Sequence, residues 1–384
     1  MIISSRPDLA AVLAFAFAAL FTAVIVPLVR RFGLRLGLID QPDARKQHTR
    51  PMVRLGGVGI VAGFVLALLL IWWLGGFVEL PPQRDALIWT TLAGSLCFFV
   101  IGLADDLFAL PPLPRLAGQL VVAMAVWSQG VRIGAIDLPF GLLGHQPGAI
   151  PLSEGLSLLA TVIWLVGITN AINWLDGLDG LAAGVSGIAA VGLLSVSYSL
   201  NQPAPGLLAA ALAGSCLGFL RHNFNPARIF MGDGGSYFLG FALAAISIIG
   251  PAKGITSVSL LLPLLILSLP LADMSAVIMG RLRQGRSPFY PDRRHLHHRL
   301  LRVGFSHRRT VVLIYAFTQW LVALALVLAN AELRFLWLAL ATAVLIGVVI
   351  ACRRSLNREQ EDQSRVLEGP HPTPAELPGG DLPR

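Results

Sequence analysis

Acidic side chains occur at the ends of apolar stretches at three places in this chain. Asp105 and Asp106 close the stretch VIGLADDLFAL, Asp176 and Asp179 follow another in NAINWLDGLDGL, and Asp233 precedes a third in IFMGDGGS. A carboxylate beside a hydrocarbon span is costly, so such residues usually have a function. Carboxylate and amide oxygens are the ligands of hard divalent cations. The pattern therefore predicts a Mg²⁺ site, with Mn²⁺ as an alternative ion.

The composition indicates a membrane protein. Of the 384 residues, 55% are hydrophobic and 13% are charged, whereas soluble domains contain about 25% charged residues. The formal net charge is +8, and an excess of positive charge can indicate a protein that binds nucleic acid. Here, however, the basic residues fall between apolar stretches, so they indicate membrane topology and no nucleic-acid partner. Cys97, Cys216 and Cys352 lie in separate stretches without paired spacing, so neither a disulfide framework nor a thiolate metal site is expected.

Eleven stretches are long and apolar enough to cross a lipid bilayer, which takes about 20 residues. We therefore expect an all-α polytopic membrane protein with an integral membrane domain over residues 1–354. Residues 355–384 are polar and rich in proline, and we expect a disordered cytoplasmic tail there. The eleven predicted spans are 9–29, 54–74, 86–104, 116–130, 156–172, 180–200, 205–221, 235–250, 255–279, 310–330 and 334–352.

Lysine and arginine residues orient these spans, because they are enriched on the cytoplasmic side. With the N-terminus outside and the C-terminus in the cytoplasm, all the acidic motifs become cytoplasmic. The external segment 134–155 has short apolar strands broken by Gly and Pro, which predicts a small hairpin. Only five of the 29 basic residues then fall outside, namely Arg6, Arg84, Arg132, Lys253 and Arg334.

Asp105 and Asp106 are adjacent, so on a helix their side chains point about 100° apart. They can hardly clamp one ion together. We expect one to face the site while the other takes a hydrogen bond or a basic partner. The alternative is a pair held in water at the end of a helix.

Asn170, Asn173 and Asp176 recur every three residues, and Asp179 continues the series. On a helix this spacing places the side chains along one face, which predicts a strip of oxygens at the end of a span. The glycine after each aspartate permits a turn or the close approach of a phosphate. Helix capping is the structural alternative.

Asp233 lies in a glycine-rich turn. Such a turn could let its carboxylate reach a metal-bound diphosphate, while nearby backbone N–H groups cradle anionic oxygens. The alternative is that Asp233 or Ser236 only caps the next helix.

Basic residues form two further motifs. In DRRHLHHRL, His295, His297 and His298 lie among arginines and form a cationic patch. Phosphate binding, contact with anionic lipid and metal binding all remain open for it, although zinc usually has a different ligand set. The loop DQPDARKQH contains Arg45 and Lys46, which either face the same site or only set the topology.

These motifs, in this order and topology, resemble the polyprenyl-phosphate N-acetylhexosamine-1-phosphate transferase superfamily. The resemblance runs from about residue 30 to residue 310. It implies a multi-pass enzyme of the bacterial inner membrane with a cytoplasmic active site. Such an enzyme transfers a sugar-1-phosphate from a UDP-N-acetylhexosamine to undecaprenyl phosphate, releases UMP and requires Mg²⁺. A homodimer is compatible with it.

Within the superfamily, the chain is more similar to the undecaprenyl-phosphate GlcNAc-1-phosphate transferases that initiate O-antigen, enterobacterial common antigen or teichoic acid linkage. The alternative is the phospho-MurNAc-pentapeptide transferase of peptidoglycan synthesis. That branch usually has ten spans and three consecutive histidines, whereas Leu296 separates His295 from His297 here. A lipid or sugar transporter is a third possibility, but it predicts acids near mid-span.

The resemblance also implies residue roles. Asp233 is expected to be the principal Mg²⁺ ligand and Asn173 a second one. Asp105 and Asp106 are expected to contact or deprotonate the lipid phosphate, and the histidines to belong to a loop that closes over the phosphates. Asp176 and Asp179 are expected to line the nucleotide-sugar site, and the remaining binding positions are Lys46, Arg45, Arg115 and Asn170.

Overall fold

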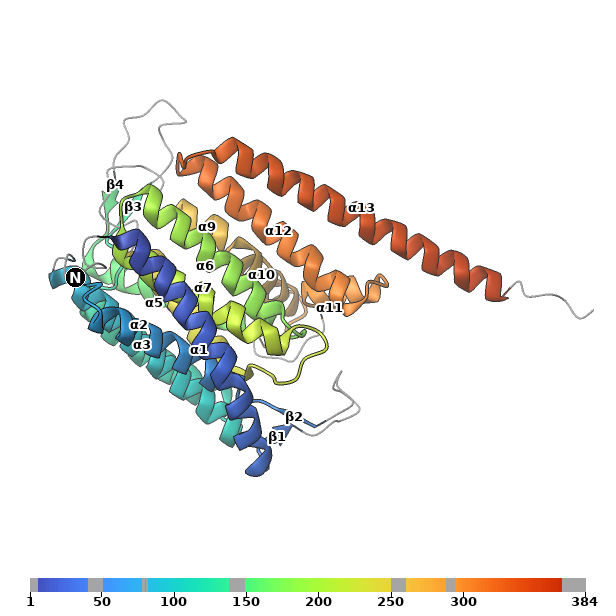
Figure 1. Cartoon of the computed structure of the whole chain (residues 1–384), viewed down its shortest axis with the longest axis horizontal. Coiled ribbons are helices and arrows are strands. Elements are labelled where there is room, and N and C mark those ends of the chain that lie inside the picture. The colour runs from blue at the N-terminus through green and yellow to red at the C-terminus, as the bar shows by residue number, and fades with distance from the viewer. Residues whose placement is uncertain are drawn as a thin grey trace, which may run out of the picture.

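The computed structural model describes residues 6–40, 51–77, 80, 82–137, 149–249, 260–287 and 294–367. In these ranges the protein is a bundle of α-helices with two short antiparallel hairpins (Figure 1). The predicted all-α class is therefore confirmed.

Nine helices of the described ranges are long and apolar enough to span a membrane. Eight lie at predicted spans one, two, three, five, six, seven, eight and ten, and the ninth begins with the last predicted span. They are α1 (Pro7–Arg35), α2 (Gly56–Trp73), α3 (Pro82–Phe108), α5 (Glu154–Leu175), α6 (Leu181–Ser199), α7 (Pro203–Asn223), α8 (Gly232–Ile249), α12 (His307–Leu328) and α13 (Arg334–Leu367).

The two other predicted spans differ in form. The fourth is the 17-residue helix α4 (Pro112–Ser128). The ninth is broken into α9 (Leu261–Ile266) and α10 (Ser268–Leu282). Proline 270 explains the break, because it has no N–H for the carbonyl of Ile266 and its ring would clash with that carbonyl. The prediction of one continuous helix over 255–279 is therefore wrong for the part of this segment that the structure describes.

Two hairpins and one short helix complete the fold. The first hairpin pairs β1 (Ile39–Asp40) with β2 (Met52–Val53). The second pairs β3 (Ala135–Asp137) with β4 (Ala149–Pro151), which confirms the predicted hairpin. The helix α11 (Leu296–Arg302) contains most of the histidine motif.

Helix α8 is the most enclosed of the long helices, and nearly all of its apolar stretch is buried. The helices α2, α3, α5, α6 and α7 pack around it. Two glycines permit the closest approaches: a methyl group on Gly57 would lie 2.5 Å from the Cα of Gly235, and one on Gly102 would lie 2.5 Å from the carbonyl carbon of Asp233. The backbone at Asp233 is thus held tightly by its neighbours.

Helix α13 packs on α12 at the edge of the bundle and extends well beyond it (Figure 1). It continues to Leu367, so the described part of the expected tail, residues 355–367, is helical in this structure. The sequence LNREQEDQ is compatible with a helix, because its Leu, Arg, Glu and Gln residues have good helix propensity,. Residues 368–384 lie outside the described ranges.

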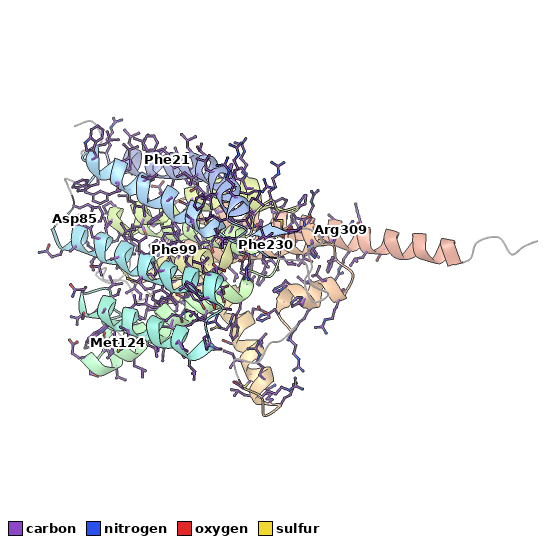
Figure 2. All side chains as sticks on the ribbon, turned by 90° about the horizontal axis from the view of Figure 1, so that it is seen from below. Phe21, Asp85, Phe99, Met124, Phe230 and Arg309 are labelled. Carbon is purple, nitrogen blue, oxygen red and sulfur yellow. The ribbon has the colours of Figure 1, made fainter. Side chains whose placement is uncertain are left out.

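The two ends of the bundle carry different segments. Asp85 lies at one end, while Phe230 and Arg309 lie toward the other, together with α10 and α11 (Figure 2). This arrangement agrees with the predicted placement of these segments on opposite sides of a membrane.

Candidate active site

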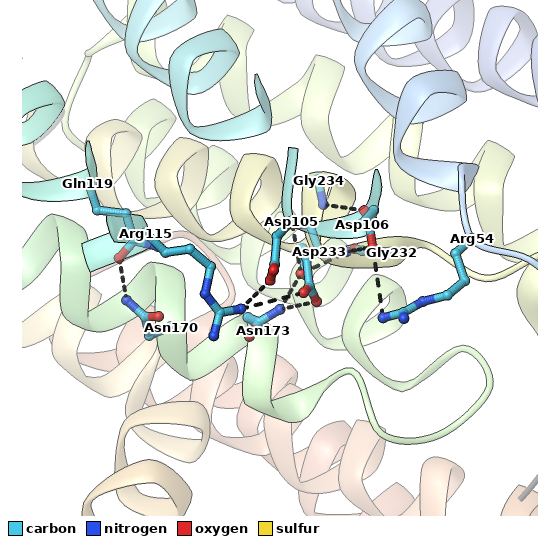
Figure 3. Close-up of polar contacts among 11 residues, drawn as sticks. Arg54, Asp105, Asp106, Arg115, Gln119, Asn170, Asn173, Gly232, Asp233 and Gly234 are labelled. Carbon is cyan, nitrogen blue, oxygen red and sulfur yellow. Dashed lines mark hydrogen bonds and ion pairs between the residues drawn. The ribbon is translucent and has the colours of Figure 1, made fainter. Parts of the chain in front are cut away.

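Asp106 anchors the start of α8. Its carboxylate accepts hydrogen bonds from the backbone N–H groups of Asp233 and Gly234, both at 2.9 Å (Figure 3). The first N–H groups of a helix have no partner within the helix, and a negative charge is favourable there. The guanidinium of Arg54 lies 3.8 Å from the same carboxylate. The side chain of Asp106 is therefore engaged in positioning Asp233.

Asp233, Asn173, Asp105 and Arg115 form the centre of the site (Figure 3). The amide of Asn173 donates to Oδ1 of Asp233 at 2.8 Å and to Oγ of Ser236 at 2.9 Å. Arg115 pairs with Asp105 and also lies 3.8 Å from Oδ2 of Asp233. The side chain of Asp105 is only 7% exposed, whereas that of Asp233 is 25% exposed. Asp233 therefore offers the more accessible carboxylate to a ligand.

Asp176 directly follows α5 and keeps partial exposure to solvent. Burial, and then the negative charges of Asp233, Asp106 and Asp179, raise its pKa from 3.8 to about 7, although Arg54 opposes the shift,. Burial is the main cause of the raised pKa, and the neighbouring carboxylates add to it.

The variant Asp176→Asn should relieve a pH-dependent destabilisation. Between about pH 4 and pH 7 the folded protein retains a proton that the unfolded chain has released. The free energy of unfolding of the wild type therefore falls as the pH rises through this range. Asparagine does not titrate, so the unfolding temperature of the variant relative to wild type should rise over this interval and level off above it. Thermal unfolding in detergent with a chelator measures this difference, and a difference that shrinks with rising pH would contradict the assignment.

Asp179 does not continue the strip of oxygens on α5, because that helix ends at Leu175. Instead, Oδ2 of Asp179 accepts hydrogen bonds from the side chain of Asn225 and the backbone N–H of Ala227, both at 3.0 Å. The turn is completed by Gly180, whose φ of 79° suits glycine,. Asp179 thus holds the loop that leads to α8, and the prediction that it belongs to the strip is wrong.

Two side chains connect this turn and α5 to neighbouring helices. Asn223 is buried, accepts from the N–H of Gly180 and donates to the carbonyl of Ile229, both at 2.9 Å. It joins the acidic turn to the loop before α8. Asn170 lies one helical turn before Asn173 and donates to Gln119 of α4 at 2.8 Å, so it contacts that helix rather than the carboxylates (Figure 3).

The histidine motif lies against the acidic turn, but its three histidines differ. His295 bonds through Nδ1 to Asp273 of α10 at 2.9 Å. His297 is 1% exposed and packs against Gly177. Burial, together with the neighbouring imidazoles of His298 and His295, lowers the pKa of His297 to about 3,. His297 is therefore neutral, and the prediction that it belongs to a cationic patch is wrong.

Sequence motifs do not identify several residues of the site. Arg54, Gln119 and Asn223 belong to none of the predicted site motifs. Asp273 is an acid within the predicted ninth span, and an ionisable residue in a span is a functional candidate in its own right; this signal could have identified it. The predicted binding residues Arg45 and Lys46 lie outside the described residues.

The donor set suits Mg²⁺ if substrate oxygens complete the coordination. Among the described residues, no group of three or more His, Cys, Asp or Glu side chains could hold a metal ion by itself. Mg²⁺ in phosphate-transferring sites is commonly held by one or two carboxylates, substrate phosphates and water. Asp233 and the Oδ1 of Asn173, whose amide N–H groups are already used, provide such a set. The crowding of carboxylates around Asp176 also favours a cation.

The chain is similar to known enzymes over most of its length. The family model described as glycosyl transferase family 4 matches residues 88–251. A Bacillus subtilis protein named probable undecaprenyl-phosphate N-acetylglucosaminyl 1-phosphate transferase is 36% identical, over 86% of this chain and 87% of the relative. The decaprenyl-phosphate N-acetylglucosaminephosphotransferase of Mycobacterium tuberculosis is also 36% identical, over 78% of this chain and 77% of the relative. An undecaprenyl-phosphate alpha-N-acetylglucosaminyl 1-phosphate transferase of Salmonella typhi is 29% identical, over 77% of each chain.

The match to the family model includes the three acidic motifs, and the relatives carry the names of the branch that the motifs favour. The chain belongs to the polyprenyl-phosphate N-acetylglucosaminyl-1-phosphate transferases of glycosyl transferase family 4.

Proposed function

We propose that the protein transfers N-acetylglucosamine-1-phosphate from UDP-N-acetylglucosamine to undecaprenyl phosphate. An oxygen of the lipid phosphate bonds to the β-phosphorus of the donor, the bond to UMP breaks, and undecaprenyl-diphosphate-N-acetylglucosamine forms. This product initiates an envelope polysaccharide. The partly exposed carboxylate of Asp233 accepts a hydrogen bond from Asn173 and faces Arg115. It carries the proposal because it provides an anchor for a cation-bound diphosphate beside a fixed positive charge.

Asp233 and Asn173 would hold the Mg²⁺ ion, with Mn²⁺ as a substitute. When bound, the ion neutralises negative charge on the phosphate oxygens. Arg115 contributes a permanent positive charge, and Asp105 fixes its direction. Asp106 keeps the start of α8, and with it the backbone of Asp233, in place.

A strong general base is not the main requirement of this reaction. The second pKa of a phosphate monoester is about 6, so the acceptor is mostly ionised at neutral pH. The main barrier is the approach of one anion to another, so the site should act chiefly by neutralising charge. We therefore propose direct attack by the lipid phosphate, without a covalent intermediate on an aspartate.

The location of the site follows from its substrates. UDP-sugars are cytoplasmic, so the acidic end of the bundle should face the cytoplasm of a bacterial plasma membrane, with the N-terminus outside. The acids lie where α3 and α5 end and α8 begins. A transporter that couples ions would instead carry them near mid-span.

Radiolabelled transfer to lipid tests the proposal. Purified protein with Mg²⁺, undecaprenyl phosphate and a panel of UDP-sugars should label the lipid most efficiently from UDP-N-acetylglucosamine. Decaprenyl phosphate belongs in the same panel because both lipid lengths occur in the names of the relatives. Labelling only from UDP-MurNAc-pentapeptide would favour the peptidoglycan alternative and overturn the donor assignment.

A further inference from the structure

Asp273 makes two polar contacts with the histidine motif. Its Oδ2 lies 2.9 Å from Nδ1 of His295, and its Oδ1 accepts a hydrogen bond from the backbone N–H of Leu296 at 2.7 Å. The side chains of Asp273 and His295 are 8% and 10% exposed. This carboxylate therefore fixes both the imidazole and the start of α11.

The contact with Asp273 determines which nitrogen of His295 remains available. A carboxylate at Nδ1 requires that nitrogen to donate, so Nδ1 carries a proton and Nε2 is left for another partner. The His295 ring also packs edge-on against Trp174, with centroids 5.8 Å apart. Trp174 follows Asn173 directly, so the ring of His295 contacts the last turn of α5, the helix that carries Asn173.

Two further contacts hold the histidine motif and α10 against the end of α5 and the turn that follows it. The ring of His297 packs against Gly177, which directly follows Asp176. The guanidinium of Arg281 lies 4.8 Å from the centre of the Trp174 ring. A series of contacts therefore leads from Asp273 through His295 to the end of α5, the helix in which Asn173 contributes to the acidic site.

We propose that Asp273 is a positioning residue that fixes the ring and tautomer of His295, so that Nε2 of His295 meets a substrate phosphate. This inference rests on the proposed transferase function. Asp273 itself does not touch the substrate, and its effect passes through His295.

A double-mutant cycle tests the proposal in the full-length protein. The variants are Asp273→Asn, His295→Gln and the two combined, measured for kcat and for KM of both substrates. Loss of the partner that orients a metal-bound histidine commonly lowers activity about 10- to 100-fold. By analogy, we expect Asp273→Asn to lower kcat/KM by a similar factor. In the presence of His295→Gln, the same substitution should have almost no further effect. Equal effects of Asp273→Asn in both backgrounds would show a purely structural role and overturn the proposal.

Asparagine at 273 retains an oxygen for the N–H of Leu296, which favours folding of the variant. The matched control is Asp85→Asn, at the other end of the bundle, which should leave the kinetic constants unchanged (Figure 2). An inactive wild type would count against the proposed function. An active wild type in which the two substitutions have additive effects on kcat/KM would count only against the role of Asp273.

A second measurement is made on the wild-type protein, and a variant is used only to assign one signal. Nitrogen-15 NMR of histidine-labelled wild-type protein, with His295 assigned through His295→Gln, should show a proton on Nδ1 of His295. An unprotonated Nδ1 would overturn the proposal.

Discussion

Replacing Asp233 with asparagine should lower the rate of UMP release by about 100- to 1000-fold, because it would weaken binding of the cation that stabilises the developing negative charge. The carboxylate is more accessible than that of Asp105 and faces both Asn173 and Arg115. Asparagine has nearly the same shape but lacks the negative charge that would hold a divalent cation. The measurement is UMP release from purified protein at saturating concentrations of both substrates.

The Asp233→Asn variant should remain folded. Its side-chain oxygen can still accept the hydrogen bond from Asn173, and its backbone N–H can still donate to Asp106. Thermal unfolding checks the fold, and Asp85→Asn controls for the change of charge. Turnover near the wild-type rate in a folded Asp233→Asn protein would contradict the site assignment.

Adding a single methyl group at Gly102 should impair both stability and activity. The new carbon would lie 2.5 Å from the carbonyl carbon of Asp233, and a backbone atom cannot move aside as a flexible side chain can. Overpacking of this kind costs about 1–3 kcal/mol in the free energy of unfolding. A shift of about 1 Å at a reacting site can cost about 100-fold in rate, so we expect Gly102→Ala to lower kcat by about that factor.

Gly167 provides the matched control because a methyl group there would meet nothing within 4 Å. Alanine is favoured over glycine in a helix by about 0.5–1 kcal/mol, so Gly167→Ala should be as stable as wild type or more so, and fully active. The two variants are compared by thermal unfolding in detergent and by initial rates. Wild-type stability and rate for Gly102→Ala would show that close packing of α3 on α8 is not required.

The sequence predicts that the acidic motifs lie on the same side of the membrane, because that side depends only on the number of spans between them. Each motif lies at the end of an apolar stretch, so the parity of the spans predicts one side for all of them. Asp105, Asp106, Asn173, Asp176 and Asp233 do lie together. Arg115 joins them as the resemblance implied.

The individual partners could not be predicted in this way. Asp179 contacts the loop before α8 because α5 ends earlier than the three-residue spacing suggests. His297 is buried because a glycine at position 177 makes room for its ring. These contacts depend on the residue at which each helix ends and on how closely the helices approach one another. A sequence motif specifies neither. The break before α10 is different, because Pro270 was visible in the sequence and could have predicted it.

The central claim is that this site joins a sugar-1-phosphate directly to a lipid phosphate. The most direct measurement is UMP release from UDP-N-acetylglucosamine by purified protein with Mg²⁺, with and without undecaprenyl phosphate. The account predicts that UMP appears only with the lipid phosphate and in equal amount to the lipid-linked product. Stoichiometric UMP without the lipid would contradict direct transfer, and no UMP with both substrates would contradict the function itself.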